Sequence, residues 1–132
     1  MLFSLKGKKV VVTGGCSGIG KSIALTFMQQ GAEVHVIDLH ESTEPLPSKI
    51  HFHQADITDL EVVEQIATRL TSIDILVNNA GIPQIGNLEK TSPADFQRIF
   101  DVNVKGAYHC MYAFIPNMVK QKSGVILNMA SV

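Results

Sequence analysis

Short apolar runs alternate with amphipathic stretches along the whole 132-residue chain, and no internal repeat interrupts them. Strands that are joined by helices run parallel, because a tight hairpin cannot return the chain in the same direction. The pattern therefore predicts an open α/β sheet with helices on both faces. The predicted strands are Lys9–Thr13, Glu33–Asp38, His51–Asp56, Ile73–Val77 and Val125–Met129.

Three amphipathic regions separate these strands. The first helix is expected over Gly18–Gln30. The second follows Thr58-Asp59-Leu60-Glu61, a capping-box pattern in which the Thr58 hydroxyl accepts from an early helix amide and Glu61 reaches back. The third is a long helical region that starts at Ser92-Pro93 and has a break near Asp101.

Composition excludes several classes of protein. Eleven Lys and Arg residues against twelve Asp and Glu give a net charge of −1, so neither nucleic acid nor an anionic membrane is an expected partner. No stretch resembles a signal or a membrane span, which predicts a cytoplasmic protein. The two cysteines, Cys16 and Cys110, have neither disulfide-framework nor zinc-ligand spacing.

A glycine-rich loop follows the first predicted strand and opens the first helix: Thr13-Gly14-Gly15-Cys16-Ser17-Gly18-Ile19-Gly20. Such glycines let the backbone turn tightly and approach a pyrophosphate, whose charge is favoured at a helix N-terminus. The same residues, read from Gly15 to Lys21-Ser22, also fit the phosphate loop of nucleoside triphosphatases, with Lys21 on phosphate and Ser22 on magnesium. Both readings remain open at this point.

Asp38 favours the dinucleotide reading. It ends the second predicted strand, about 20 residues beyond the loop, where a carboxylate accepts from the ribose hydroxyls of NAD and repels the 2′-phosphate of NADP. No Arg or Lys occurs between Gly14 and Gly20 or at Leu39. The sequence therefore predicts a Rossmann-type domain that prefers NAD.

With these motifs in strand-end order, the chain resembles the short-chain dehydrogenase/reductase family over all of its positions. Asp56-Ile57 after the third strand, Asn78-Asn79-Ala80-Gly81 after the fourth and Asn103 in the long helical region complete the resemblance. It implies that the glycine loop holds pyrophosphate, that Asp56 and Ile57 lie by the adenine, and that residues 79–81 line the cofactor's ribose. The implied cofactor residues are Gly14, Ser17, Gly18, Ile19, Gly20, Asp38, Asp56, Ile57, Asn79, Ala80 and Gly81.

The resemblance also implies two catalytic residues. Asn103 matches an asparagine that distorts its helix and holds a water in a proton relay, and Ser131 matches a serine that orients the substrate oxygen. The implied reaction is hydride transfer between the nicotinamide and a small secondary alcohol or ketone. Side-chain amides in Asn78-Asn79 are expected to tie the carboxyl ends of neighbouring strands together.

The family's acid/base motif, Tyr-x-x-x-Lys, does not occur in this sequence. Tyr108 is followed four residues later by Tyr112, and Tyr112 by Pro116. We expect residues 1–132 to be the NAD-binding part of a truncated enzyme, incomplete at its C-terminus, that is inactive alone. A non-catalytic dinucleotide-binding remnant is the alternative, and the triphosphatase is a third reading.

Two further expectations concern histidines and the long helix. His51 and His53 lie on one side of a predicted strand, but no third His or carboxylate stands in ligand spacing, so we expect ordinary strand histidines and no metal site. Tyr108 and Tyr112 are expected to serve packing. The resemblance implies that part of the apolar face of this helix pairs two subunits of a full-length homo-oligomer.

Overall fold

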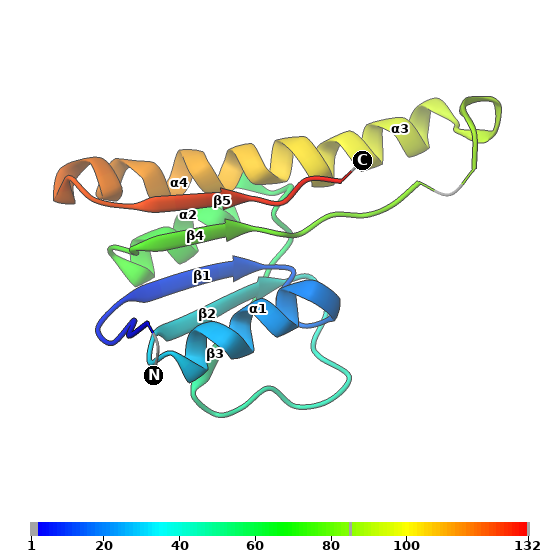
Figure 1. Ribbon diagram of the computed structural model, residues 1–132. Coiled ribbons are helices and arrows are strands. Elements are labelled where there is room, and N and C mark those ends of the chain that lie inside the picture. Colours follow the sequence, from blue (N-terminus) through cyan, green and yellow to red (C-terminus); the bar gives the residue numbers. More distant parts are fainter. Residues whose placement is uncertain (1–2, 85, 132) are drawn as a thin grey trace.

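The computed structural model describes residues 3–84 and 86–131 of the chain. They form one parallel sheet with the strand order β3-β2-β1-β4-β5 (Figure 1). The Rossmann-type architecture predicted from the alternating pattern is confirmed. The strands are β1 Lys9–Thr13, β2 Glu33–Asp38, β3 Ile50–Gln54, β4 Ile75–Asn78 and β5 Val125–Asn128.

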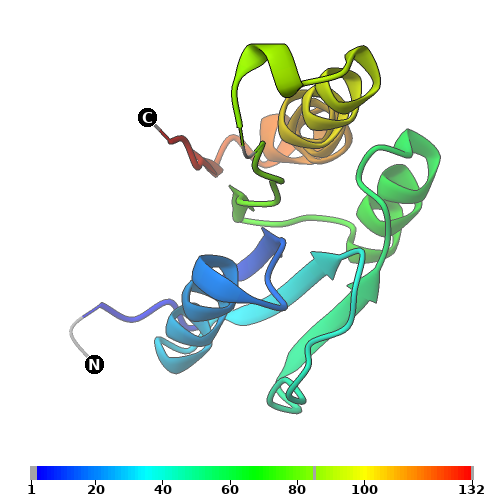
Figure 2. The same cartoon turned by 90° about the vertical axis from the view of Figure 1, so that its right-hand side faces the viewer.

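Helices cover both faces of the sheet. Helix α1 lies on one face, and α2 and α4 lie on the other (Figure 2). Each face has its own apolar core, because the side chains of a strand point alternately to the two sides. The helices are α1 Gly18–Gln29, α2 Leu60–Leu70, α3 Pro93–Phe100 and α4 Gly106–Gln121, with a short 3₁₀ turn, η1, at Leu88–Lys90.

Two predicted strand boundaries were wrong by two residues, and three others by one residue. The third strand ends at Gln54 and not at Asp56, because the Asp56 carboxylate accepts from the Thr58 amide at 2.9 Å and from its hydroxyl at 2.7 Å, which turns the chain. The fourth begins at Ile75 and not at Ile73. Ile73 is buried although it precedes the strand, so the pattern of apolar residues placed the start of the strand too early.

The predicted cap of helix α2 was also wrong. Asp59, not Thr58, is the N-cap: its carboxylate accepts from the amides of Glu61 and Val62. The Thr58 hydroxyl donates instead to Asp56. Both residue types can cap a helix, so the competing Asp56 side chain decided which one does.

The long helical region changes from α-helix to π-helix at Asp101, where the sequence predicted a break. It continues from α3 through one π-helical segment, η2 at Asp101–Lys105, into α4. Its faces divide clearly, because Cys110, Phe114 and Met118 are buried while Tyr108 and Tyr112 are about half exposed. Tyr108 and Tyr112, which were expected to serve packing, are therefore outside the buried core of the described residues.

Strand β5 lies at one edge of the sheet and pairs only with β4 in the part of the chain that the structure describes. Val125, Leu127 and Met129 project from it with about half of their surface exposed. This apolar strand is thus an edge of the described sheet.

Candidate functional site

A cleft of about 840 Å³ lies at the carboxyl edge of the sheet, where ligands bind in open parallel α/β folds. It is lined by residues that follow β1, β2, β3 and β4, together with one side of α3 and η2. All of the residues that the sequence assigned to a cofactor line this cleft, except Gly20. The fold therefore gathers four separate sequence motifs in one place.

The glycine loop forms one wall of the cleft and leaves room above its backbone. Gly18 has φ of +53°, and a Cβ there would meet no atom within 4 Å. Gly14 is different, since a Cβ on it would lie 2.9 Å from the Cα of Ala80. Gly20 lets helix α1 pack against the loop, because a Cβ would overlap the Gly14 carbonyl oxygen. The backbone at Gly18 is thus open to a ligand, while Gly14 and Gly20 allow the close backbone packing that positions the loop.

The N-terminus of α1 is suited to a negative group. Its cap residue, Ser17, makes no side-chain hydrogen bond to the first turn, and that turn holds no acidic residue. The first amides of a helix have no partner within the helix and carry partial positive charge. Together with the space over Gly18, this arrangement fits a pyrophosphate.

Asp38 is held at the end of β2 by two backbone amides. Its Oδ2 accepts from the amide of Cys16 at 3.0 Å, and its Oδ1 accepts from the amide of His40 at 3.2 Å. A carboxylate offers about four lone-pair positions, so two remain for a ligand. The bond to Cys16 fixes the acid beside the glycine loop.

Thr13 is a supporting residue that the sequence analysis did not single out. Its hydroxyl, which is buried, accepts from the amides of Asn79 and Ala80 at 3.0 Å each and donates to the Val77 carbonyl. The Asn79 side chain donates in turn to the carbonyls of Thr13 and Gly14 at 3.2 Å each. These bonds join the ends of β1 and β4 under the cleft.

The amide group of Asn78 joins the next pair of strands. It donates to the Asn128 side chain at 2.8 Å, across the β4 and β5 ends. The prediction that these asparagine amides tie neighbouring strand ends together is confirmed. Only the tertiary pairing shows which partner each amide takes.

Ile57 is fixed by helix α4. A Cβ on Gly106 would lie 2.5 Å from the Cδ1 of Ile57, so this glycine lets the side chain pack against the helix. The ring of His109, which is buried, donates from Nδ1 to the Ile57 carbonyl at 2.7 Å. His109 is thus a structural neighbour of the cleft that no local sequence pattern indicates.

Asn103 lies in the π-helical segment and binds the loop after β4. Its Oδ1 accepts from the Ile82 amide at 2.8 Å, and its Nδ2 donates to the Ile82 carbonyl at 2.9 Å. Gly81 beside it allows this close approach, since a Cβ would lie 3.2 Å from Asn103 Oδ1, which is a tight contact. Ser131 is exposed and follows β5 at the same edge of the sheet.

Two cations bear on the competing readings. The Lys21 amine donates to the Ser42 hydroxyl at 3.3 Å, which directs it to the loop after β2. A triphosphatase would need that amine over the glycine loop. Arg98 of α3 lines the cleft. This cation lies about 80 residues after the glycine loop along the chain, so the sequence of the loop alone does not indicate it.

The sheet order and the glycine loop that precedes helix α1 are those of a Rossmann-type α/β domain. Comparison with known proteins gives the family. Residues 8–132 match the family model described as short chain dehydrogenase. The chain belongs to the short-chain dehydrogenase/reductase family of oxidoreductases.

Known relatives of similar sequence are longer than this chain. The 3-oxoacyl-(acyl-carrier-protein) reductase FabG of Thermotoga maritima is 36% identical over 97% of this chain and 57% of its own length. D-xylose 1-dehydrogenase of Caulobacter vibrioides is 33% identical over 98% of this chain and 55% of its own length. The 132 residues thus span about half the length of the curated relatives they match.

A solved structure has the same fold. The ligand-free aldohexose dehydrogenase of Thermoplasma acidophilum superposes with a TM-score of 0.89 and 35% identity, over 98% of this chain and 51% of that one.

Among residues 3–84 and 86–131, no helix is both long and apolar enough to cross a membrane.

Proposed function

We propose that residues 1–132 are the NAD-binding part of a cytoplasmic oxidoreductase that acts on a small secondary alcohol or ketone. The observation that carries this proposal is the position of Asp38. Its carboxylate is bonded to the Cys16 amide of the glycine loop, next to the open space over Gly18. A carboxylate so close to the pyrophosphate position accepts from the ribose and disfavours a 2′-phosphate.

The chain's own residues would divide the work of binding. The glycine loop and the α1 N-terminus hold the pyrophosphate, Asp38 holds the adenine ribose, and Asp56 and Ile57 flank the adenine. Asn79, Ala80 and Gly81 line the second ribose. When bound, the nicotinamide supplies or accepts a hydride.

We assign Asn103 and Ser131 to the catalytic half of the site. Ser131 would hydrogen-bond the substrate oxygen, and Asn103 would fix the loop at Ile82, to which both of its amide groups are bonded. Because the sequence has no Tyr-x-x-x-Lys, the chain lacks the family's proton donor. We therefore expect NAD binding without turnover by these residues alone.

The exposed face of the long helix supports the expectation of a homo-oligomer. Large apolar side chains repeat along it at helical spacing, and in one molecule about half of their surface is exposed. A second copy that packs against this stripe would bury it. The stripe comprises Phe96, Phe100, Val104, Tyr108, Tyr112, Ile115 and Val119.

The binding proposal is tested by titrating the chain with NAD, NADP and magnesium ATP, followed by calorimetry. We expect NAD to bind most tightly. Gly18→Ala should weaken NAD at least tenfold, because the new methyl group enters the space over the loop. Gly7→Ala is the matched control, since Gly7 also has a positive φ, +82°, and nothing within 4 Å of a Cβ.

Both glycine variants pay a similar backbone penalty of about 1 kcal/mol, so only the ligand separates them. Equal NAD affinity in Gly18→Ala and Gly7→Ala would remove the loop from the site. Magnesium-dependent ATP binding that is lost in Lys21→Ala would instead support the triphosphatase reading.

A further inference from the structure

Four polar side chains gather on one face of β2 and β3, away from the candidate cofactor cleft. In the parallel register, His35 pairs with His51 and Ile37 pairs with His53. Side chains two residues apart on a strand share a face, so Glu33 joins the same group. The expectation that His51 and His53 lack a third His or a carboxylate nearby was wrong, because strand pairing supplies both.

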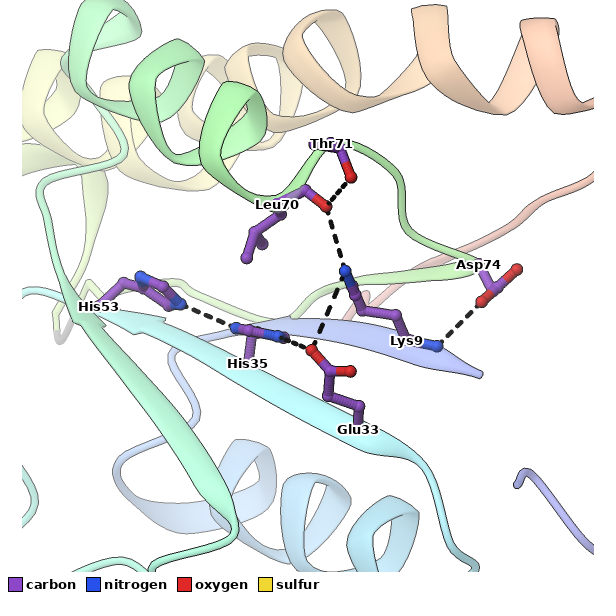
Figure 3. A network of polar contacts seen from close by, with 7 residues as sticks. All are labelled: Lys9, Glu33, His35, His53, Leu70, Thr71 and Asp74. Carbon is purple, nitrogen blue, oxygen red and sulfur yellow. Dashed lines mark hydrogen bonds and ion pairs between the residues drawn. The ribbon is translucent and has the colours of Figure 1, made fainter. Parts of the chain in front are cut away.

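A chain of hydrogen bonds runs through this group (Figure 3). Glu33 Oε1 lies 2.7 Å from His35 Nε2, and His35 Nδ1 lies 2.9 Å from His53 Nε2. An ionised carboxylate only accepts, so His35 Nε2 carries a proton and Nδ1 accepts from His53. If His35 takes the other tautomer, Nδ1 donates to His53 and the Nε2 lone pair becomes free.

The second tautomer is the arrangement of a metal-binding histidine. Such a residue usually donates its other ring nitrogen to a neighbour, which fixes the ring. His35 is 5% exposed, so its ring is already held in place by packing. The ring of His51 stacks on it with centroids 4.6 Å apart.

The three potential ligand atoms are close enough to share an ion. One atom each of Glu33, His35 and His51 lie within 4.8 Å of one another. Tetrahedral ligands about 2.1 Å from zinc lie about 3.4 Å apart, so a movement of up to about 1.4 Å is needed. Glu33 and His51 are exposed and can make it, and they also leave a path for entry.

One neighbouring charge opposes an ion. The Lys9 amine lies 3.9 Å from Glu33 Oε1. This amine also donates to the Leu70 carbonyl at 3.1 Å, so it is held from two sides (Figure 3). The second oxygen of Glu33 remains for a ligand.

We propose that Glu33, His35 and His51 bind one divalent transition-metal ion such as Zn²⁺, with His53 as the hydrogen-bond partner that orients His35. Two imidazoles and a carboxylate are a ligand set that zinc accepts, with water in the fourth position. The ion would join β2 to β3, which lies at the other edge of the sheet. It would stabilise that edge independently of any bound dinucleotide.

The experiment is a calorimetric titration of the 132-residue chain with Zn²⁺ at pH 7.5, with Mg²⁺ as the comparison ion. We expect one Zn²⁺ per chain, a higher midpoint of thermal unfolding in its presence, and no binding of Mg²⁺. His51→Gln and Glu33→Gln, which change exposed side chains, should each weaken Zn²⁺ at least tenfold. His53→Leu should weaken it about tenfold while the stoichiometry stays at one.

His40→Gln is the control, because His40 is an exposed histidine outside the cluster. It should leave Zn²⁺ affinity unchanged. The proposal is overturned if no saturable Zn²⁺ binding occurs, or if His40→Gln weakens binding as much as His51→Gln does. Equal affinity in 8 M urea would also overturn it, because the ligands come from two strands that only the fold brings together.

Discussion

Replacing Asp38 by Asn should change which dinucleotide the chain prefers. The variant keeps the size of the side chain and replaces one carboxylate oxygen with an amide nitrogen. Asp38 accepts from the amides of Cys16 and His40. An asparagine can keep the first bond, and the second amide is at an exposed residue where water replaces the lost oxygen. The free energy of unfolding should fall by less than about 1 kcal/mol.

The effect on binding should be larger. A hydrogen bond to a charged acceptor contributes about 1.5–3 kcal/mol, and a neutral one about 1 kcal/mol, so NAD should bind about tenfold more weakly. For NADP, the variant removes the repulsion between a carboxylate and a phosphate. Two unit charges about 4 Å apart repel by about 1 kcal/mol in water and about 4 kcal/mol near a protein surface. The preference for NAD over NADP should therefore fall at least tenfold.

The assay is calorimetric titration of both dinucleotides into the wild-type chain, Asp38→Asn and Asp56→Asn. Asp56 is a second carboxylate of the same cleft, so its variant loses the same charge elsewhere in the site. It should change the affinity for NAD but leave the ratio of the two affinities within about twofold. An unchanged ratio in Asp38→Asn would refute the role assigned to this residue.

Three further predictions concern stability. Thr13→Val should lower the free energy of unfolding in urea by about 3 kcal/mol, because two backbone amides lose their acceptor. The control is Thr26→Val, which removes an exposed hydroxyl hydrogen bond within α1 and should lower this free energy by less than about 1 kcal/mol. Phe114→Ala should lower the free energy of unfolding by about 3–5 kcal/mol and Tyr112→Ala by less than about 1 kcal/mol, since only Phe114 of the two is buried. Equal losses of stability would contradict the assigned faces of α4. Burial lowers the pKa of His53 from about 6.5 in the unfolded chain to about 4 in the folded chain. Between these two pH values the unfolded chain binds a proton that the folded chain does not. The free energy of unfolding should therefore fall as the pH falls from about 6.5 to 4 in metal-free buffer. His53→Gln should flatten that part of the profile, as measured by urea unfolding at each pH.

The alternation of apolar runs and amphipathic stretches was enough to predict the sheet and its helices. Periodicity is a local property, and the β-branched runs of this chain are short and clearly separated, so local reading succeeded. The boundaries at Asp56 and Thr58 were missed because the hydrogen bond between these two side chains competes with both the strand and the cap. Nothing in the residue types says which bond forms.

The motifs at the strand ends were sufficient to predict the candidate cleft. In a parallel sheet all carboxyl ends meet at one edge, so residues such as Asp38 and Asn79 had to lie near one another once the strands were placed. Their supports were not predictable in this way. Thr13 and His109 act through partners 52 to 67 residues away along the chain.

The fold class, the family resemblance and the position of the cofactor residues were predictable from local patterns and their order along the chain. The buried face of α4, the partners of Asp38 and the contact of Glu33 and His35 with His51 became visible only in the folded chain. Each depends on contacts between residues far apart in the sequence; for the histidines, the contact comes from the register of β2 against β3, which no single strand encodes.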